Sequence, residues 1–280
     1  MKSLAILGPG LLGGSIALAA RRAGGWRVGL WARRAEAVAE IEERGIADAV
    51  STDLRGIVAG ADLVILCVPI GVMPALAREI ADAISADTIV TDVGSVKAPV
   101  VAELGAIFRG RGRFVGSHPM AGSEQTGIAA ARTELFDDAA CILTPDASSD
   151  AGAVAELRAF WQSLGSRVLE VPPAGHDEIV ALVSHLPHLL AATLVHTVQA
   201  ENAGAFDFSG PGFRDTTRVA SGPPAMWAEI LRTNRDAVRK SAEAMIEKLR
   251  EIITLLDREP QMTEFLTQAK AQRDRLRPLK

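Results

Sequence analysis

The chain has 280 residues, enough for two domains of ordinary size, and its 48% hydrophobic and 23% charged residues are typical of a folded globular protein. A formal net charge of -4 argues against a general nucleic-acid binder, and two cysteines, Cys67 and Cys141, supply neither a disulfide framework nor a metal-ligand spacing. No uninterrupted apolar stretch approaches the roughly 20 residues of a membrane helix, and the first residues lack a signal-peptide core, so we expect a cytoplasmic protein without a membrane partner.

The first expected element is a short strand over residues 4–7, which enters the turn Gly8-Pro9-Gly10-Leu11-Leu12-Gly13 and then a helix. A G-x-G-x-x-G turn between a strand and a helix is typical of dinucleotide binding. Gly8 makes the turn, Gly10 lets the backbone approach the pyrophosphate, and Gly13 lets the helix pack closely on the strand. The amino terminus of the helix, at Leu11 and Leu12, would offer unpaired N–H groups to the phosphates.

The second strand, residues 26–31, indicates which nicotinamide cofactor is used. NAD sites usually carry an acidic residue at the end of this strand, whereas NADP sites often supply an arginine. Here the end reads Ala32-Arg33-Arg34, so NADP is favoured over NAD because two guanidiniums can bind the 2′-phosphate. The alternative is that Arg33 and Arg34 are the solvated start of a helix over residues 36–43.

The alternation of strands and helices continues through the first half of the chain. Residues 62–68 are expected to form an apolar strand whose last residue, Val68, is followed by Pro69. Residues 88–91 are expected to form the next strand. Strands joined by helical crossovers run parallel, so their ends share one edge with the glycine turn. Ser95 would then face the nicotinamide region, although it could equally be a helix N-cap. Further strands are expected at residues 113–118, 141–144 and 167–171, with a helix over residues 150–164.

The stretch Gly116-Ser117-His118-Pro119-Met120-Ala121-Gly122-Ser123-Glu124 is the candidate centre of the chemistry. It begins where a parallel strand is expected to end, which is where ligands bind in open α/β sheets. A histidine there can exchange a proton near neutral pH, so His118 is a candidate acid–base group. The alternative is a partly exposed loop histidine with no chemical role.

After Pro172-Pro173 the pattern changes from mixed to helical. Long helical patterns cover residues 176–199 and 224–259, and apolar residues recur at helical spacing in the second. Helices without a sheet of their own need a partner for these faces, so we expect a homodimer. The sequence therefore predicts an α/β Rossmann-type domain over residues 1–172 followed by an all-α dimerisation domain over residues 173–280. The glycine-rich segment 204–223 between the helices is expected to be a functional linker.

Two histidines lie three residues apart in Ser184-His185-Leu186-Pro187-His188. They fall on one helical face, and Pro187 is expected to kink or break the helix. Without a carboxylate or cysteine at zinc-site spacing a metal site is disfavoured, and we predict no metal. Buried structural histidines and anion-binding histidines both remain open interpretations.

Five blocks in chain order together resemble the prephenate/arogenate dehydrogenase family of tyrosine biosynthesis; they are residues 8–15, 92–97, 116–124, 184–188 and 213–220. The resemblance implies NAD(P)-dependent oxidative decarboxylation of a dianionic substrate, prephenate to 4-hydroxyphenylpyruvate or arogenate to tyrosine. It also implies a dimer formed by the carboxyl-terminal helices and an active site between the domains. The missing acidic residue after the second strand departs from the NAD-using members and places NAD in question.

The resemblance also assigns roles to individual residues. His118 would be the catalytic histidine, with Ser95 as its hydrogen-bonding neighbour. The cofactor would be bound by Gly8, Gly10, Leu11, Leu12, Gly13, Arg33, Arg34, Val68 and Pro69. The substrate would be bound by His185, His188, Arg218, Ser117, Glu124 and Asp215.

Two other functions stay open at this point. One is a different dehydrogenase with the same two-domain plan, of the β-hydroxyacid or imine reductase type. A lysine on the first long interdomain helix would favour a β-hydroxyacid dehydrogenase, and none occurs between His176 and Arg239. The other is a nonenzymatic NADP-binding protein, which would bind the dinucleotide without reducing it.

Overall fold

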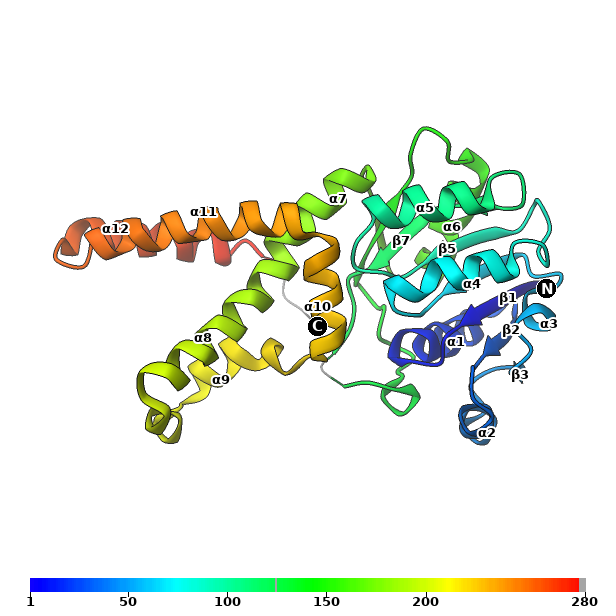
Figure 1. The fold of residues 1–280 in the computed structure, drawn as a ribbon, viewed down its shortest axis with the longest axis horizontal. Coiled ribbons are helices and arrows are strands. Elements are labelled where there is room, and N and C mark those ends of the chain that lie inside the picture. The colour runs from blue at the N-terminus through cyan, green and yellow to red at the C-terminus, as the bar shows by residue number, and fades with distance from the viewer. Residues whose placement is uncertain (124, 277–280) are drawn as a thin grey trace.

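A computed structural model describes residues 1–123 and 125–276 and shows two parts, an α/β domain and an arm of helices (Figure 1). The α/β domain contains a six-stranded sheet in the order β3-β2-β1-β4-β5-β6. Every neighbouring pair in it is parallel, so the carboxyl ends of all six strands share one edge. The Rossmann-type prediction is therefore confirmed. The strands are β1 (Lys2–Leu7), β2 (Trp26–Trp31), β3 (Ala49–Ser51), β4 (Leu63–Leu66), β5 (Ile89–Asp92) and β6 (Arg113–Phe114).

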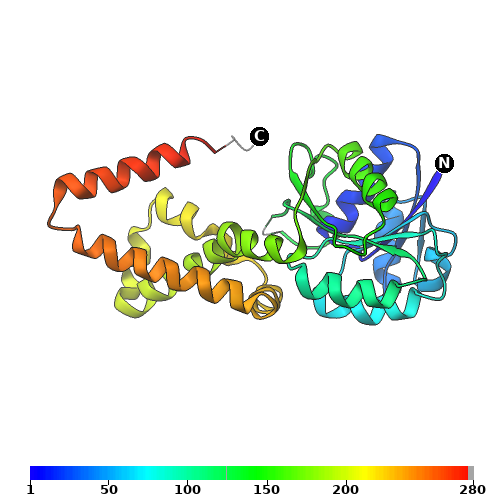
Figure 2. The same ribbon diagram turned by 90° about the horizontal axis from the view of Figure 1, so that it is seen from above.

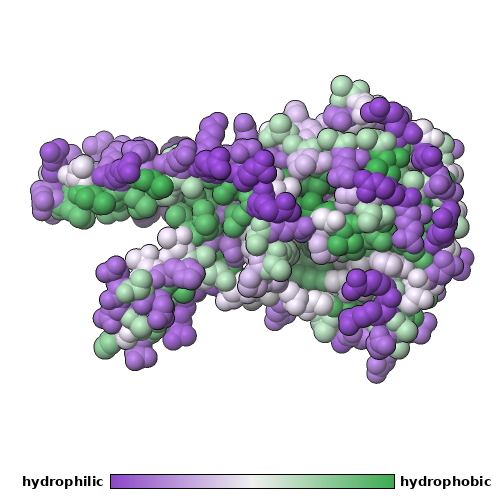
Figure 3. Space-filling view, in the orientation of Figure 1, coloured by the Kyte–Doolittle hydropathy of each residue, from purple (hydrophilic) through white to green (hydrophobic). Residues whose placement is uncertain are grey.

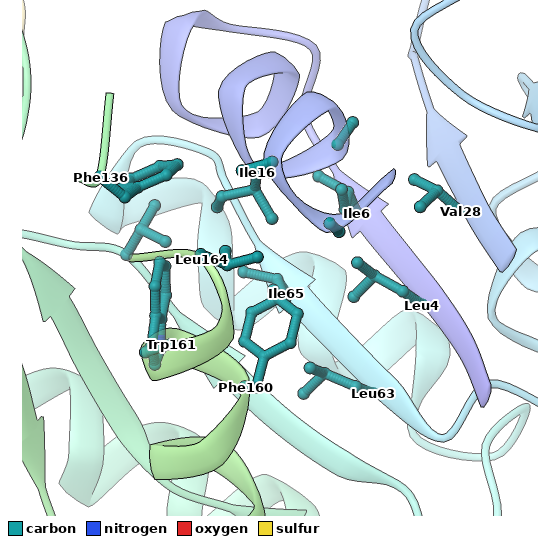
Figure 4. Close-up of a cluster of buried hydrophobic side chains, with 14 of the residues drawn as sticks. Leu4, Ile6, Ile16, Val28, Leu63, Ile65, Phe136, Phe160, Trp161 and Leu164 are labelled. Carbon is teal, nitrogen blue, oxygen red and sulfur yellow. The ribbon is translucent and has the colours of Figure 1, made fainter. Parts of the chain in front are cut away.

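Helices cover both faces of this sheet, as the view from above shows (Figure 2). Alternate side chains of β1 serve the two faces: Leu4 and Ile6 pack in one apolar core, and Ala5 and Leu7 pack in the other. The first core includes the aromatic residues of α6 (Figure 4). It is covered by α1 (Leu11–Ala23), α2 (Ala35–Arg44) and α6 (Ala151–Ser163), and the second by α3 (Leu54–Val58), α4 (Met73–Ile80) and α5 (Ala98–Phe108).

The strand expected over residues 113–118 is in fact two strands in two sheets. β6 ends the main sheet, and β7 (Gly116–Pro119) pairs antiparallel with β8 (Ala140–Thr144), which pairs parallel with β9 (Arg167–Glu170). The chain crosses between sheets at Gly116, where a Cβ would lie 2.5 Å from Oγ1 of Thr144. Glycine is therefore needed at this crossing, and the crossing turns His118 into a residue of the second sheet.

The helical arm begins with a nearly continuous run formed by α7 (Pro173–Val180), the π-helical turn η3 (Ala181–His185) and α8 (Leu186–Asn202). Pro187 lies in the first turn of α8, where its missing N–H is tolerated, and the π turn before it absorbs the distortion. Instead of the expected kink at Pro187, the helix is widened locally over a turn that includes His185 and precedes His188.

The rest of the arm differs from the sequence prediction in two places. The helix expected over residues 224–259 is broken at Asn234, and the segment expected to be a linker is mostly helical. The break at Asn234 involves no glycine or proline, so periodicity alone does not reveal it. The elements are η4 (Ala203–Phe208), α9 (Pro211–Thr217), η5 (Arg218–Ser221), α10 (Pro224–Thr233), α11 (Arg235–Thr254) and α12 (Glu259–Arg273); two short 3-10 turns, η1 (Ile70–Val72) and η2 (Ile128–Ala130), lie in the α/β domain.

By length and mean hydropathy, the helical run Pro173–Phe208 could cross a membrane, which the sequence analysis did not expect. This criterion is also met by core helices. Of the most apolar window, 33% is buried inside the protein, and the run carries the buried polar side chains His176, Asp177, His185 and His188. These side chains make the run part of the site described next.

Candidate active site

The turn between β1 and α1 is shaped to receive a dinucleotide. Gly8 has φ of +123°, and a Cβ there would lie 2.3 Å from the carbonyl oxygen of Cys67. A Cβ on Gly13 would lie 2.0 Å from the carbonyl oxygen of Gly8, so both glycines are required by packing. At Gly10 no other heavy atom lies within 4 Å of the Cβ position, which leaves room for a pyrophosphate. No side chain caps α1, so the N–H groups at Leu11 and Leu12 can face it.

The other predicted cofactor residues lie at the same edge of the sheet. Arg33 and Arg34 directly follow β2, and Arg34 is the N-cap residue of α2. Both side chains are exposed. Val68 and Pro69 follow β4, which pairs with β1. The arrangement places two cations at the far end of the edge and an apolar segment beside the glycine turn.

His118 lies on β7, is 6% exposed, and forms the first member of a hydrogen-bonded chain of three side chains. Its Nδ1 lies 2.9 Å from Nε2 of His176, and Nδ1 of His176 lies 2.8 Å from Oδ1 of Asp177. Asp177 also accepts hydrogen bonds from the backbone N–H groups of Lys97 and Ala98, at 2.7 Å and 2.8 Å. The Asp177 carboxylate on α7 thus serves as the N-terminal cap of α5 and joins the helical arm to the α/β domain.

These contacts decide which nitrogen of each ring carries a proton. Both oxygens of Asp177 accept from backbone donors, so the carboxylate is an acceptor and Nδ1 of His176 must donate to it. Nε2 of a neutral His176 is then a lone pair, and Nδ1 of His118 must donate to that lone pair. Nε2 of His118 is left as the basic nitrogen of the ring.

His118 is held in its neutral form. Burial lowers the pKa of His118 well below 6.5, and the nearby His176, Lys97 and His185 act in the same direction. Burial also lowers the pKa of His176, although its hydrogen bond to Asp177 opposes that effect. A neutral imidazole with a free lone pair can accept a proton or a hydrogen bond at physiological pH.

A fully buried ion pair lies beneath the strand that carries His118. Nζ of Lys97 contacts Oδ2 of Asp92 and donates to the carbonyl oxygen of Ser117 at 2.9 Å. The Ser117 hydroxyl donates to the carbonyl oxygen of Asp92 at 2.6 Å and accepts from Thr91 at 2.9 Å. Ser117 is 0% exposed, so its hydroxyl orients β7 against β5 and has no hydrogen left for a ligand.

His185 and His188 both lie in the helical run, and both contain a buried nitrogen without a hydrogen-bond partner in the described residues, Nε2 of His185 and Nδ1 of His188. The His188 ring stacks on Trp227 of α10 with centroids 3.6 Å apart. Asn234 donates through Nδ2 to Nδ1 of His185, at 3.1 Å, and to the carbonyl oxygen of Asp177, at 2.8 Å. Burial lowers the pKa of His185 to about 4, so this ring is neutral too.

The structure places the remaining predicted substrate residues on several elements. Ser95 is half-buried in the loop between β5 and α5, and its carbonyl oxygen lies near the His185 ring. Arg218 begins η5 and is exposed, as is Asp215 on α9. Glu124 lies outside the described residues. The contacts between α8 and both α9 and η5 connect Arg218 and Asp215 to the helix that carries His188.

Sequence reasoning missed five residues of this site. His176, Asp177 and Asn234 join positions that are 49 to 80 residues apart, and no local spacing reveals such a contact. Lys97 belongs to a block that the sequence singled out, but only its full burial shows its role. Trp227 falls within an apolar helical stripe and could not be told from a core residue. Among the described residues, no three His, Cys, Asp or Glu side chains are grouped as metal ligands.

Comparison with known proteins gives concordant matches in both parts of the chain. Residues 16–170 match the family described as "Prephenate dehydrogenase, nucleotide-binding domain", and residues 172–270 match "Prephenate dehydrogenase, dimerization domain". A prephenate dehydrogenase of Bacillus subtilis is 36% identical over 98% of this chain and 76% of its own length. A cyclohexadienyl dehydrogenase of Zymomonas mobilis is 35% identical over 91% of this chain and 88% of its own length.

Solved structures give the same result. The prephenate dehydrogenase of A. aeolicus, crystallised with hydroxyphenyl propionate and NAD+, has a TM-score of 0.90 at 32% identity and covers 98% of this chain and 97% of its own. The arogenate dehydrogenase of Synechocystis has a TM-score of 0.84 at 31% identity, with 97% and 99% covered. A 3-hydroxyisobutyrate dehydrogenase of Salmonella typhimurium, at 15% identity and a TM-score of 0.63 over 88% of each chain, shares the fold alone.

Proposed function

We propose that this chain, which belongs to the prephenate dehydrogenase family, catalyses the oxidative decarboxylation of prephenate, arogenate or both, with a nicotinamide cofactor as the hydride acceptor. The observation that carries the proposal is the position of His118. A neutral, buried imidazole whose Nε2 is a lone pair is the group needed to accept the proton of an alcohol during hydride transfer.

The residues present fit a nicotinamide dinucleotide. Gly10 leaves space for the pyrophosphate, and the uncapped amino terminus of α1 offers N–H groups and a partial positive charge. When bound, the cofactor supplies the hydride acceptor for the reaction. Val68 and Pro69, which follow β4, would hold its nicotinamide end, and the half-buried Ser95 would face the same region.

The proposed role of His118 concerns one proton, that of the C4 hydroxyl of the substrate. As hydride leaves C4 of the cyclohexadiene, the C4 hydroxyl gains positive character, and Nε2 of His118 stabilises it by accepting its hydrogen bond. His176 and the Asp177 carboxylate face the positive charge that develops on the His118 ring. Loss of carbon dioxide from C1 then makes the ring aromatic, and the shared proton returns to the phenolic oxygen.

A dianionic substrate also needs donors that are not bases. We propose Arg218 as the carboxylate-binding cation, with His185 and His188 as neutral donors or acceptors in the buried part of the site. Asp215 and Glu124 are proposed as polar groups near its entrance. Ser95 is proposed to share the C4 hydroxyl with His118.

NADP is the proposed preference, because Arg33 and Arg34 are exposed at the end of β2 where an NAD site has an acidic residue. Guanidiniums at that position can hold a 2′-phosphate in a bidentate manner. The homologous A. aeolicus enzyme was crystallised with NAD+, so the alternative cofactor is included in the test below.

A cytoplasmic homodimer is the proposed state of the protein, with the domain boundary between residues 172 and 173. Large apolar side chains are exposed along one side of the α11–α12 arm, where the space-filling view shows an apolar band (Figure 3). Ile246, Leu249, Ile253 and Leu256 are between 46% and 69% exposed. An apolar stripe of this kind is typical of an interface between subunits.

The test is a nicotinamide-reduction assay with prephenate and arogenate, each paired with NADP and NAD. We expect reduction with at least one pair, and His118→Asn should lower kcat by about 10² to 10⁴ while KM changes little, because the lost interaction strengthens only in the transition state. Cofactor binding without reduction in every pairing would reject the activity. An unchanged kcat in His118→Asn would reject the role of this histidine.

A further inference from the structure

Asn234 occupies the break between α10 and α11, and its side chain points into the protein. It serves as C-cap of α10 and N-cap of α11, with φ of −104° and ψ of 27°. It is 6% exposed, although nothing in its helix-capping position requires a buried amide. Its side chain makes no cap hydrogen bond and contacts α7 and the π-helical turn η3 instead.

The partners of Asn234 fix the orientation of its amide. The carbonyl oxygen of Asp177 can only accept, so the atom 2.8 Å from it must be the amide nitrogen. The same nitrogen lies 3.1 Å from Nδ1 of His185. An amide nitrogen has two hydrogens, and it can donate one to each partner.

This donation fixes the protonation of His185. Nδ1 receives a hydrogen bond and must be a lone pair, so the proton of a neutral ring is on Nε2. That N–H is buried, and no described residue makes a hydrogen bond of normal geometry to it. His185 is 0% exposed, and the Ser95 carbonyl oxygen lies close enough to the ring to raise its pKa, so Nε2–H is an interior donor for which Ser95 and a bound ligand would compete.

We propose that Asn234 is a positioning residue that locks His185 in its Nε2–H tautomer, so that the ring donates a hydrogen bond to a carboxylate oxygen of the bound substrate. The proposal rests on the proposed function for the identity of the ligand. His118 and His185 then have opposite hydrogen-bonding roles. The Asp177 carboxylate makes His118 an acceptor for the hydroxyl, and the Asn234 amide makes His185 a donor for the anion. A neutral donor binds the carboxylate without adding a second acid beside His118.

The first experiment reads the tautomer directly and needs no turnover. The chain has five histidines, so histidine-selective ¹³C and ¹⁵N labelling of the full protein gives few ring signals, and His185→Gln assigns the one of interest. We expect His185 to be neutral with its proton on Nε2 at pH 7, and to stay so on binding of substrate. A proton on Nδ1, or a charged ring, would overturn the proposal even in an active enzyme.

The second experiment changes the lock. In Asn234→Asp the side chain can only accept, so His185 should move its proton to Nδ1, and KM for the substrate should rise about 10- to 100-fold with cofactor Kd unchanged. Asn202→Asp is the matched control. Oδ1 of the exposed Asn202 accepts a hydrogen bond from the backbone N–H of Gly204 at 3.1 Å, and a carboxylate oxygen can accept the same bond.

A double variant separates positioning from stability. If Asn234 acts through His185, then Asn234→Ala should raise KM in the parent protein but add little in the His185→Gln background. Equal losses in both backgrounds would overturn the proposal. A parent protein that has the Nε2–H tautomer but converts neither prephenate nor arogenate would instead overturn the proposed function and the carboxylate as the ligand.

Discussion

The order of hydrogen bonds in the chain His118, His176, Asp177 determines which ring nitrogen can react. The contacts are 2.9 Å and 2.8 Å long, and the Asp177 carboxylate at the end of the chain accepts hydrogen bonds on both of its oxygens. Because Asp177 only accepts, His176 must be protonated on Nδ1, and because Nε2 of His176 is then a lone pair, His118 must also be protonated on Nδ1. A change at Asp177 therefore reaches His118 although the two side chains do not touch.

Asp177→Asn should lower kcat by about 10- to 100-fold. If the amide that replaces the Asp177 carboxylate turns its NH2 group toward His176, the tautomers of His176 and His118 both reverse, and Nε2 of His118 carries a proton. If the amide is turned the other way, its NH2 group faces the N–H of Ala98, so that two donors meet. Unfolding in urea should show a loss of about 1–3 kcal/mol from that unsatisfied contact. Glu178→Gln is the control, because Glu178 is the exposed neighbour on the same helix. A normal kcat for Asp177→Asn would remove the chain from the mechanism.

The sequence pointed to single reactive residues and not to the residues that orient them. His118 stands out because it lies where a parallel strand is expected to end, and His185 and His188 stand out because they lie three residues apart on one helical face. Asp177 directly follows His176 at the start of a helix, and that position is explained equally well by helix capping. Only the folded chain shows that it caps another helix, 79 residues away in sequence from Ala98.

At the scale of elements, α10 links three parts of the site. Near its middle Trp227 stacks on His188, at its end Asn234 holds His185, and between them Glu229 reaches the α/β domain. Oε1 of Glu229 accepts a hydrogen bond from the backbone N–H of Gly71 at 2.7 Å. Gly71 lies in η1, which directly follows Val68 and Pro69, so one helix contacts both the segment proposed to hold the cofactor and the histidines proposed to bind the substrate.

Glu229→Ala should raise KM for substrate and cofactor together, by about 3- to 10-fold, with kcat nearly unchanged. The loss corresponds to one hydrogen bond of about 0.5–1.5 kcal/mol between the domains. Glu229→Gln keeps a carbonyl acceptor for the N–H of Gly71 and should behave like the parent protein. Steady-state kinetics with each ligand varied in turn would check this. An effect on one ligand alone would show that α10 does not couple the two sides.

Periodicity predicted the main elements well where an element is long and its boundaries carry glycine or proline. β2 and α6 lie where the sequence placed them to within about a residue. β3 escaped notice because it has three half-buried residues and no alternation. The break at Asn234 escaped because apolar residues continue at helical spacing on both sides of it. Such breaks are set by contacts with distant residues, here Asp177 and His185.

At the scale of the whole molecule, the change of pattern after Pro172-Pro173 corresponds to the passage from the α/β domain to the arm (Figure 1). The candidate active site lies at this junction, because Asp177 of α7 caps α5 and His176 of α7 lies within hydrogen-bond distance of His118 on β7. Burial of these histidines is therefore a property of the assembled molecule. Four of the five are buried, namely His118, His176, His185 and His188.

This burial predicts how stability depends on pH. The pKa of each of these four histidines is lowered in the folded protein, chiefly by burial, and for His185 it falls to about 4. In the unfolded chain a histidine has a pKa of about 6.5. Below that pH the unfolded state binds more protons, so stability is full above about pH 7 and is lost as the pH falls, for His185 over the window from about 6.5 to 4.

Each such histidine contributes up to about 1.4 kcal/mol of lost unfolding free energy per pH unit within its window. Urea unfolding followed by the fluorescence of the four tryptophans, at fixed protein concentration from pH 7.5 to 4.5, should show this decline. His185→Gln removes one titrating group. Between pH 6 and 4.5 the unfolding free energy of the variant should therefore fall less steeply than that of the parent protein, by up to about 1.4 kcal/mol per pH unit. A parallel pH dependence in the variant and the parent would mean that the His185 ring takes up a proton as readily in the folded protein as in the unfolded chain, and that the interior of the site is open to water.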